Sequence, residues 1–140
     1  MTDSTAPAVA AIPDLAAFDL AGPSEKGATM ELLHPVTGAK LHVSMEVMGS
    51  DAPKFRKNLR QLRDILARTP DDEDMDQDVK DVLAEARISA CAVKAWSGVV
   101  YQGEAMPFTF DNAVKVFSGL PWIGQQVALF RSSRANFFKG

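Results

Sequence analysis

Residues 96–138 read WSGVVYQGEAMPFTFDNAVKVFSGLPWIGQQVALFRSSRANFF, and this stretch decides the expected fold. Either Thr109 or Asp111 is suited to cap a helix, which we expect over residues 111–118. A proline then opens a second apolar-periodic segment and predicts a final helix over residues 121–136. The stretch is rich in aromatic residues but contains no catalytic constellation. This combination favours a binding surface.

Two longer helices are expected before this stretch. Pro53 stands in a helix opening, and the apolar residues that follow it recur at spacings of four, three and four, which predicts a helix over residues 51–68. A second set of apolar residues at helical spacing predicts a helix over residues 74–97, which Gly98 would end. The second helix should be the longest and the most central.

The remaining elements complete a fold class that is mainly α with a small N-terminal β-hairpin, an α+β arrangement. Alternating apolar residues on either side of a proline-glycine turn predict this hairpin over residues 29–48. Residues 1–27 are rich in alanine and proline, and we expect them to form a flexible arm. Residues 28–140 should then form a single compact helical domain.

Composition sets the general class of the protein. A chain of 140 residues with 46% hydrophobic content is sufficient for one domain with one core. No run approaches the ~18 apolar residues of a membrane span, and the first 20 residues lack the basic segment of a signal peptide. The single cysteine, Cys91, permits no internal disulfide, which is consistent with a reducing cytoplasm.

Charge is strongly separated along the chain, although the formal net charge is only -3. Residues 54–68 contain six basic side chains and one acid, whereas residues 71–81 contain seven acids and one lysine. One interpretation is that both blocks are solvated helix faces that attract each other across a short loop. The other is that the basic block is a docking face for an acidic partner.

The side chains that could be reactive or bind a metal do not form a recognisable catalytic or metal-binding motif in the sequence. There is no phosphate-binding glycine loop, HExxH motif or cysteine pair, and His34 and His42 flank a turn without metal-ligand spacing. Cys91 lies between two alanines in an expected helix, where packing is its ordinary role. The acidic run from Asp71 lacks the glycine and the closing glutamate of a calcium loop. We therefore expect neither an enzyme nor a bound metal or cofactor.

The aromatic residues of the last third have two interpretations. Six of them could be core side chains of a small helical domain or contacts with a partner: Trp96, Phe108, Phe110, Phe117, Trp122 and Phe130. Phe137 and Phe138 come after the last expected helix, so packing and partner contact are equally open for them.

The order of these features resembles the tail assembly chaperones of long-tailed, siphophage-like bacteriophages. In that family a tryptophan-glycine pair, a proline-phenylalanine pair with an acidic or amide cap, a proline-aromatic pair and an asparagine-phenylalanine pair occur in the same order. The resemblance covers roughly residues 29–138, and its specific part is 96–137. The residues that form this structural cassette are Trp96, Gly98, Pro107, Phe108, Asp111 and Pro121. The residues that the resemblance suggests for partner binding are Trp122, Gln125, Phe130, Arg134, Phe137 and Phe138.

This resemblance implies a non-enzymatic function. Such a chaperone binds the long helical tape measure protein in the host cytoplasm, keeps it soluble and extended, aids recruitment of tail tube subunits, and is absent from the mature virion. The tail tube protein and further copies of the chain are additional expected partners, whereas nucleic acid and membranes are not.

Two other classes remain as alternatives. A structural virion component, such as a tail completion or head-tail joining protein, would stay in the particle. A DNA-binding regulator would use the basic segment 54–68 and bind duplex DNA in a salt-sensitive manner.

Overall fold

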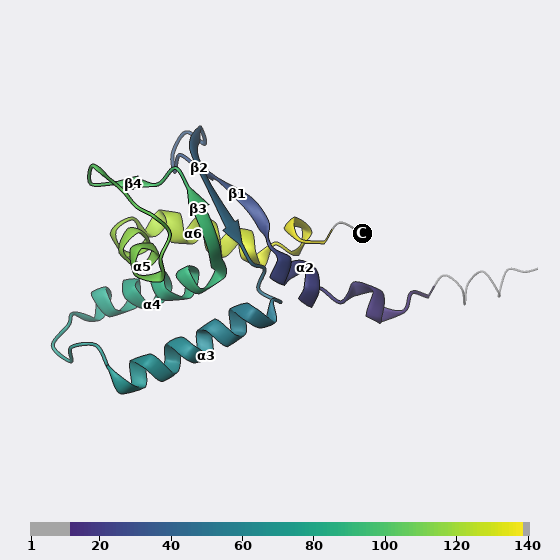
Figure 1. Cartoon of the computed structure of the whole chain (residues 1–140), viewed down its shortest axis with the longest axis horizontal. Coiled ribbons are helices and arrows are strands. Elements are labelled where there is room, and N and C mark those ends of the chain that lie inside the picture. The colour runs from purple at the N-terminus through teal and green to yellow at the C-terminus, as the bar shows by residue number, and fades with distance from the viewer. Residues whose placement is uncertain (1–11, 139–140) are drawn as a thin grey trace, which may run out of the picture.

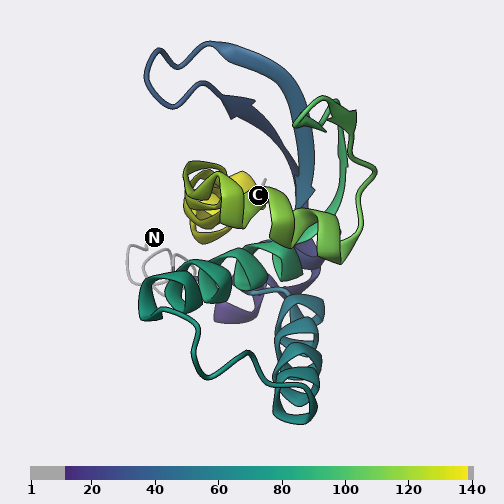
Figure 2. The same cartoon turned by 90° about the vertical axis from the view of Figure 1, so that its left-hand side faces the viewer.

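The described part of the chain is a layered α+β domain. In this computed structural model, residues 12–138 are described, so residues 1–11 of the expected arm lie outside the described residues. A three-stranded antiparallel sheet contains β1 (Ala28–Leu33), β2 (Lys40–Val47) and β3 (Val93–Ser97), in that spatial order. Figure 2 shows the β1-β2 hairpin curving over α6, with α4 beneath α6 and α3 at the bottom.

Five α-helices within residues 12–138 accompany this sheet. They are α2 (Ala21–Lys26), α3 (Pro53–Arg68), α4 (Gln77–Ala92), α5 (Phe110–Gly119) and α6 (Pro121–Ser132). Two short 3-10 helices, η1 (Leu15–Phe18) and η2 (Arg134–Asn136), lie near the two ends of the described chain. Two-residue strands β4 (Val100–Tyr101) and β5 (Glu104–Ala105) form a second, separate antiparallel pair. Figure 1 shows this order from α2 to the C-terminus.

The core lies between the sheet and the helices. Met30, Met45 and Val47 point inward from β1 and β2, because residues two apart on a strand share one face. Phe117 of α5 and Val127 of α6 are almost completely buried in the same core. α6 contacts both β1 and β2, so the curved hairpin covers this helix. A hairpin by itself is only marginally stable in water, and packing on a helix stabilises it.

The expectation of a mainly α fold with only an N-terminal hairpin is wrong. α4 ends at Ala92, and Val93–Ser97 pairs as strand β3 with β2, where helix was expected as far as residue 97. The extended link before α5 also forms strands, because Gln102 and Gly103 both adopt positive φ angles and close a tight β4-β5 turn. Strands therefore occur in the middle and C-terminal parts of the chain as well.

Gly98 has a role that differs from the expected helix stop. It follows β3 with a φ of 81°, and a Cβ at this position would lie 2.6 Å from the backbone oxygen of His42. Only glycine fits both the backbone angle and this close approach of β2. Gly98 therefore allows the chain after β3 to lie close to the backbone of β2, and it does not terminate α4.

Candidate functional site

The least covered of the long helices is α3. It contains 16 residues, yet Phe55 is its only fully buried side chain. Leu59 and Leu62 are half-buried against the core, whereas Ile65 is 51% exposed. A strongly amphipathic helix normally buries its apolar stripe, so this stripe leaves apolar surface available on the molecule.

An apolar groove runs alongside this stripe. α3 forms one wall, the C-terminal end of α4 and the start of β3 form the floor, and the segment that enters α5 forms the other wall. The groove has a volume of about 390 Å³ and is lined by Asn58, Gln61, Leu62, Ile65, Ala90, Cys91, Val93, Phe108 and Phe110. Phe110 at its edge is 39% exposed. The groove is therefore open and has apolar residues on both walls.

A polar contact fixes the floor of the groove to α3. The Nδ2 atom of Asn58 donates a hydrogen bond to the carbonyl oxygen of Cys91, at 3.0 Å. Cys91 lies next to the last residue of α4, where backbone carbonyls have no partner within the helix. Asn58 thus satisfies one such carbonyl and holds α3 beside the end of α4.

The groove has a basic edge. Lys57 and Arg68 are exposed, and they share one helical stripe with the groove residues Gln61 and Ile65, at spacings of four, four and three. The two ion pairs seen within residues 12–138 involve other arginines, Arg87 and Arg134. Neither pair joins the basic block to the acidic block, and neither involves Lys57 or Arg68.

The lining of the groove is mainly apolar. Burial raises the pKa of the Cys91 thiol to about 11, so this side chain is protonated at neutral pH. Among the described residues, no group of three or more His, Cys, Asp or Glu side chains is placed to hold a metal ion. The groove can therefore accept an apolar helix or an extended segment, with Lys57 and Arg68 able to pair with acids beside it.

Two cassette residues, Trp96 and Phe108, belong to the aromatic cluster that supports the second wall of the groove. Trp96 lies in β3, and its Nε1 donates a hydrogen bond of 2.7 Å to the carbonyl oxygen of Met106. Its ring meets those of Phe108 and Phe117 edge to face, at centroid distances of 5.2 and 6.1 Å. Through Phe108, this cluster positions one wall of the groove.

The remaining cassette residues belong to helix starts. Thr109 is the N-cap of α5, where its hydroxyl accepts a hydrogen bond from the backbone N–H of Asn112, and Asp111 lies in the first turn. The Asn112 side chain also donates to the carbonyl oxygen of Pro107. Pro121 stands at the first position of α6.

The six residues suggested for partner binding do not lie together. Trp122 is half-buried in a hollow between the sheet and helices α5 and α6. Gln125 is exposed and lines a different hollow between α4 and α6. The other four, which are Phe130, Arg134, Phe137 and Phe138, gather at the C-terminal corner. None of the six lines the α3 groove.

Packing dominates at the C-terminal corner. Phe137 is only 5% exposed, and its ring meets Phe130 edge to face at 5.6 Å. The half-buried Phe138 lies 6.3 Å from Phe18, the last residue of η1, between ring centroids. Phe137 is therefore a core residue, whereas Phe138 joins the two ends of the described chain.

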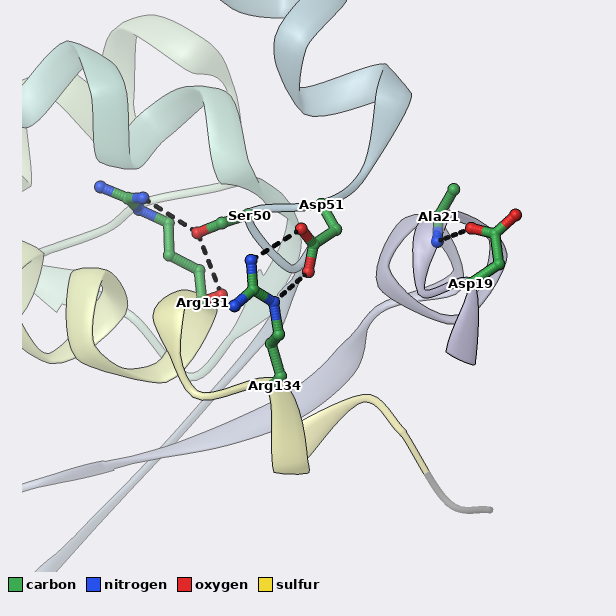
Figure 3. A network of polar contacts seen from close by, with 6 residues as sticks. All are labelled: Asp19, Ala21, Ser50, Asp51, Arg131 and Arg134. Carbon is green, nitrogen blue, oxygen red and sulfur yellow. Dashed lines mark hydrogen bonds and ion pairs between the residues drawn. The ribbon is translucent and has the colours of Figure 1, made fainter. Parts of the chain in front are cut away.

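Figure 3 shows the polar network at the same corner. The guanidinium of Arg134 forms two hydrogen bonds to the carboxylate of Asp51, at 2.7 and 3.1 Å. This pairing lowers the pKa of Asp51 and raises that of Arg134. Arg131 donates to the hydroxyl of Ser50 and lies over the ring of Phe55, 5.2 Å from its centroid. Arg131 thereby anchors the start of α3 to the end of α6.

Sequence reasoning did not single out Asn58, Ile65 and Phe110 together as lining one groove. Ile65 lies one residue outside the regular Leu59, Leu62, Leu66 stripe, and an extra apolar residue beside a stripe is a signal for a second contact face. The contribution of Phe110 depends on how α5 meets α3, and spacing along the chain does not report that.

The described residues form an α+β domain with an open, mainly apolar groove beside α3. The sequence model of the YdaY prophage protein family matches residues 50–139, which begin just before α3 and end one residue before the last residue of the sequence. Because this match covers more than half of the chain, the chain belongs to the YdaY prophage protein family and is a phage-derived protein. Neither the curated proteins nor the solved structures contain a match to it.

Proposed function

We propose that this protein is a phage tail assembly chaperone that binds the tape measure protein. The observation that carries the proposal is the open apolar groove beside α3, with Ile65 and Phe110 exposed at its edges. Membership of a prophage family and the resemblance of the 96–137 cassette to tail assembly chaperones support it.

The groove suits a long helical client. An amphipathic segment of the tape measure protein would place its apolar stripe against Leu62, Ile65 and Phe110, which is the helix-in-groove mode of recognition. Each such contact is small and tolerant of sequence. Many copies along one client would supply avidity, and each copy could be displaced when tail tube subunits polymerise.

The proposal includes the setting in which the protein acts. It works in the host cytoplasm as a binding protein and not as an enzyme, and it leaves before the virion is mature. The tail tube protein is a further proposed partner, whereas nucleic acid and membranes are not. None of the described helices has the length and apolar character needed to cross a membrane.

Co-expression with the tape measure protein of the same gene neighbourhood tests the proposal. We expect the client to become soluble and to co-purify with several copies of this chain. Ile65→Asp should abolish co-purification, because it places a charge in the apolar groove, while Leu129→Asp on the exposed face of α6 should not. A folded chain that leaves the client insoluble and unbound would contradict the chaperone function.

Mass spectrometry of purified particles tests the structural alternative. A chaperone that leaves during assembly should be missing from the particle. Its presence there in fixed stoichiometry would instead support a tail completion or head-tail joining protein.

A further inference from the structure

The segment that precedes α2 exposes an unusual amount of apolar surface. Ile12 is 73% exposed, Leu15 80% and Phe18 49%. Each of these residues is three positions after the previous one. Because a 3-10 helix has three residues per turn, Leu15 and Phe18 lie on one face of η1. Exposed large apolar side chains gathered on one short segment are typical of an interaction site.

This segment, residues 12–20, is also acidic and locally ordered. It contains Asp14 and Asp19 and no basic residue. Asp14 caps η1 by accepting a hydrogen bond from Ala16, and Asp19 accepts one from the backbone N–H of Ala21, as Figure 3 shows. We call residues 12–20 the acidic arm. Because these local hydrogen bonds already shape it, docking would cost less conformational entropy than ordering a free coil.

The α3 groove has the complementary character. Its lining is mainly apolar, its edge carries Lys57 and Arg68, and α3 as a whole contains six basic residues and one acid. The acidic arm matches it in both respects, with three apolar side chains and two carboxylates. Charge complementarity of this kind favours one partner and one orientation over others.

The position of the arm favours the groove of another molecule. In Figure 1 the acidic arm leaves the domain on the right, whereas α5, which forms one wall of the groove, lies on the left. The arm is also tied to its own domain at the C-terminal corner by the contact between Phe18 and Phe138. The arm and α5, one wall of the groove, therefore lie on opposite sides of the same domain.

We propose that the acidic arm of one copy docks in the α3 groove of a second copy. The contact is heterologous, because the two copies use different surfaces, so an open assembly keeps a free arm at one end and a free groove at the other until a ring closes. The chain alone thus forms head-to-tail assemblies. The arm also occupies the groove that the proposed function assigns to the tape measure protein, so client binding and self-association compete.

Sedimentation velocity of the full chain, without client, tests the self-association over a range of protein concentrations. We expect the wild type to form species larger than the monomer as concentration rises, and higher salt to shift them toward the monomer. Leu15→Asp/Phe18→Asp in the arm and Ile65→Asp in the groove should each weaken association by roughly tenfold or more. Val36→Asp, which changes an equally exposed apolar residue in the hairpin turn, is the matched control and should behave as wild type.

Mixing the two defective variants gives a sharper result. The arm variant retains an intact groove and the groove variant retains an intact arm, so the mixture should form a one-to-one heterodimer and nothing larger. Asp14→Lys/Asp19→Lys should weaken association, and Lys57→Glu/Arg68→Glu in the second copy should restore part of it, since the lysines also remove the hydrogen bonds that Asp14 and Asp19 accept within the arm. A monomeric wild type, or variants that all associate as the wild type does, would overturn the proposal. Because no client is present, this outcome is independent of whether the chain binds a tape measure protein.

Discussion

Helices α3 and α4 have the same length of 16 residues, yet they are used in opposite ways. α4 fully buries five residues near its C-terminal end, and these are small: Ala86, Ser89, Ala90, Cys91 and Ala92. α3 has the stronger apolar stripe in its sequence but fully buries only Phe55. Small residues let α4 approach α5 and α6 closely, whereas the large residues of α3 remain at the edge of a groove. An apolar stripe therefore indicates that a helix face should be covered. It does not indicate whether the same chain or another molecule covers it.

The largest expected effect separates the two helices directly. Ala92→Asp in α4 places a carboxylate at a site that is 0% exposed, and we expect a loss of at least about 3 kcal/mol in the free energy of unfolding, because the charge has no partner there. Ile65→Asp in α3 should change it by less than about 1 kcal/mol, since this side chain already faces solvent. Urea denaturation followed by circular dichroism measures both. A large loss for Ile65→Asp would place α3 in the core.

The second prediction asks how far the packed part of the molecule extends. Phe137→Ala should lower the free energy of unfolding by roughly 3 kcal/mol, because it removes a buried ring that packs on Phe130. Phe138→Ala, one residue later and only half-buried, should have a clearly smaller effect. Thermal melting of the two variants compares them. If both variants melted at the wild-type temperature, the C-terminal corner would not be part of the core.

The third prediction concerns Gly98, which follows β3 and lies close to the backbone of β2. Gly98→Ala should cost about 1 to 3 kcal/mol, because the new Cβ would meet the His42 carbonyl oxygen and the φ of 81° is unfavourable for alanine. Gly103→Ala is the matched control, since Gly103 has the same φ but no atom within 4 Å of its Cβ position. The difference between the two free energies of unfolding isolates the close approach of the strands. No difference would mean that the sheet adjusts at little cost.

The smallest expected effect lies in the loop between α3 and α4. Arg87 forms two hydrogen bonds of 2.8 Å to Asp71 and lowers the pKa of that carboxyl below its ordinary value of 3.8. A lowered folded-state pKa contributes stability above the unfolded-state pKa, and this contribution is lost as the pH falls through the folded-state value. Asp71→Asn should therefore destabilise the protein by less than about 1 kcal/mol at pH 7, and the difference from wild type should vanish at low pH. Urea denaturation at several pH values measures this. A difference that stays constant with pH would contradict the ion-pair origin.

Local signals in the sequence coincide with several element ends. Pro53 and Pro121 stand at the first positions of α3 and α6, because a proline fixes φ and lacks the N–H that a helix start leaves unused. Thr109 caps α5 through its own side chain. These features depend on residues within a few positions of each other, so they can be read from the sequence.

The fold class was wrong where pairing between distant segments decides structure. The helical spacing of apolar residues continues through Val93, and no helix-breaking residue occurs before Gly98. Val93–Ser97 nevertheless becomes a strand because the edge of β2 offers backbone hydrogen-bonding partners there. The groove was missed for the same reason, since its two walls are more than 40 positions apart in the chain.

The sequence by itself determined the starts of α3, α5 and α6 to within two residues, the amphipathic character of α3 and the separation of charge along the chain, because these depend on local conformation and composition. Only the tertiary structure decided that α4 ends at Ala92 and is followed directly by strand β3, that Phe137 is buried, and that Ile65 and Phe110 face one open groove. These outcomes depend on which distant segments pack together. Packing of that kind follows from the whole set of available surfaces, and no local stretch of residues contains it.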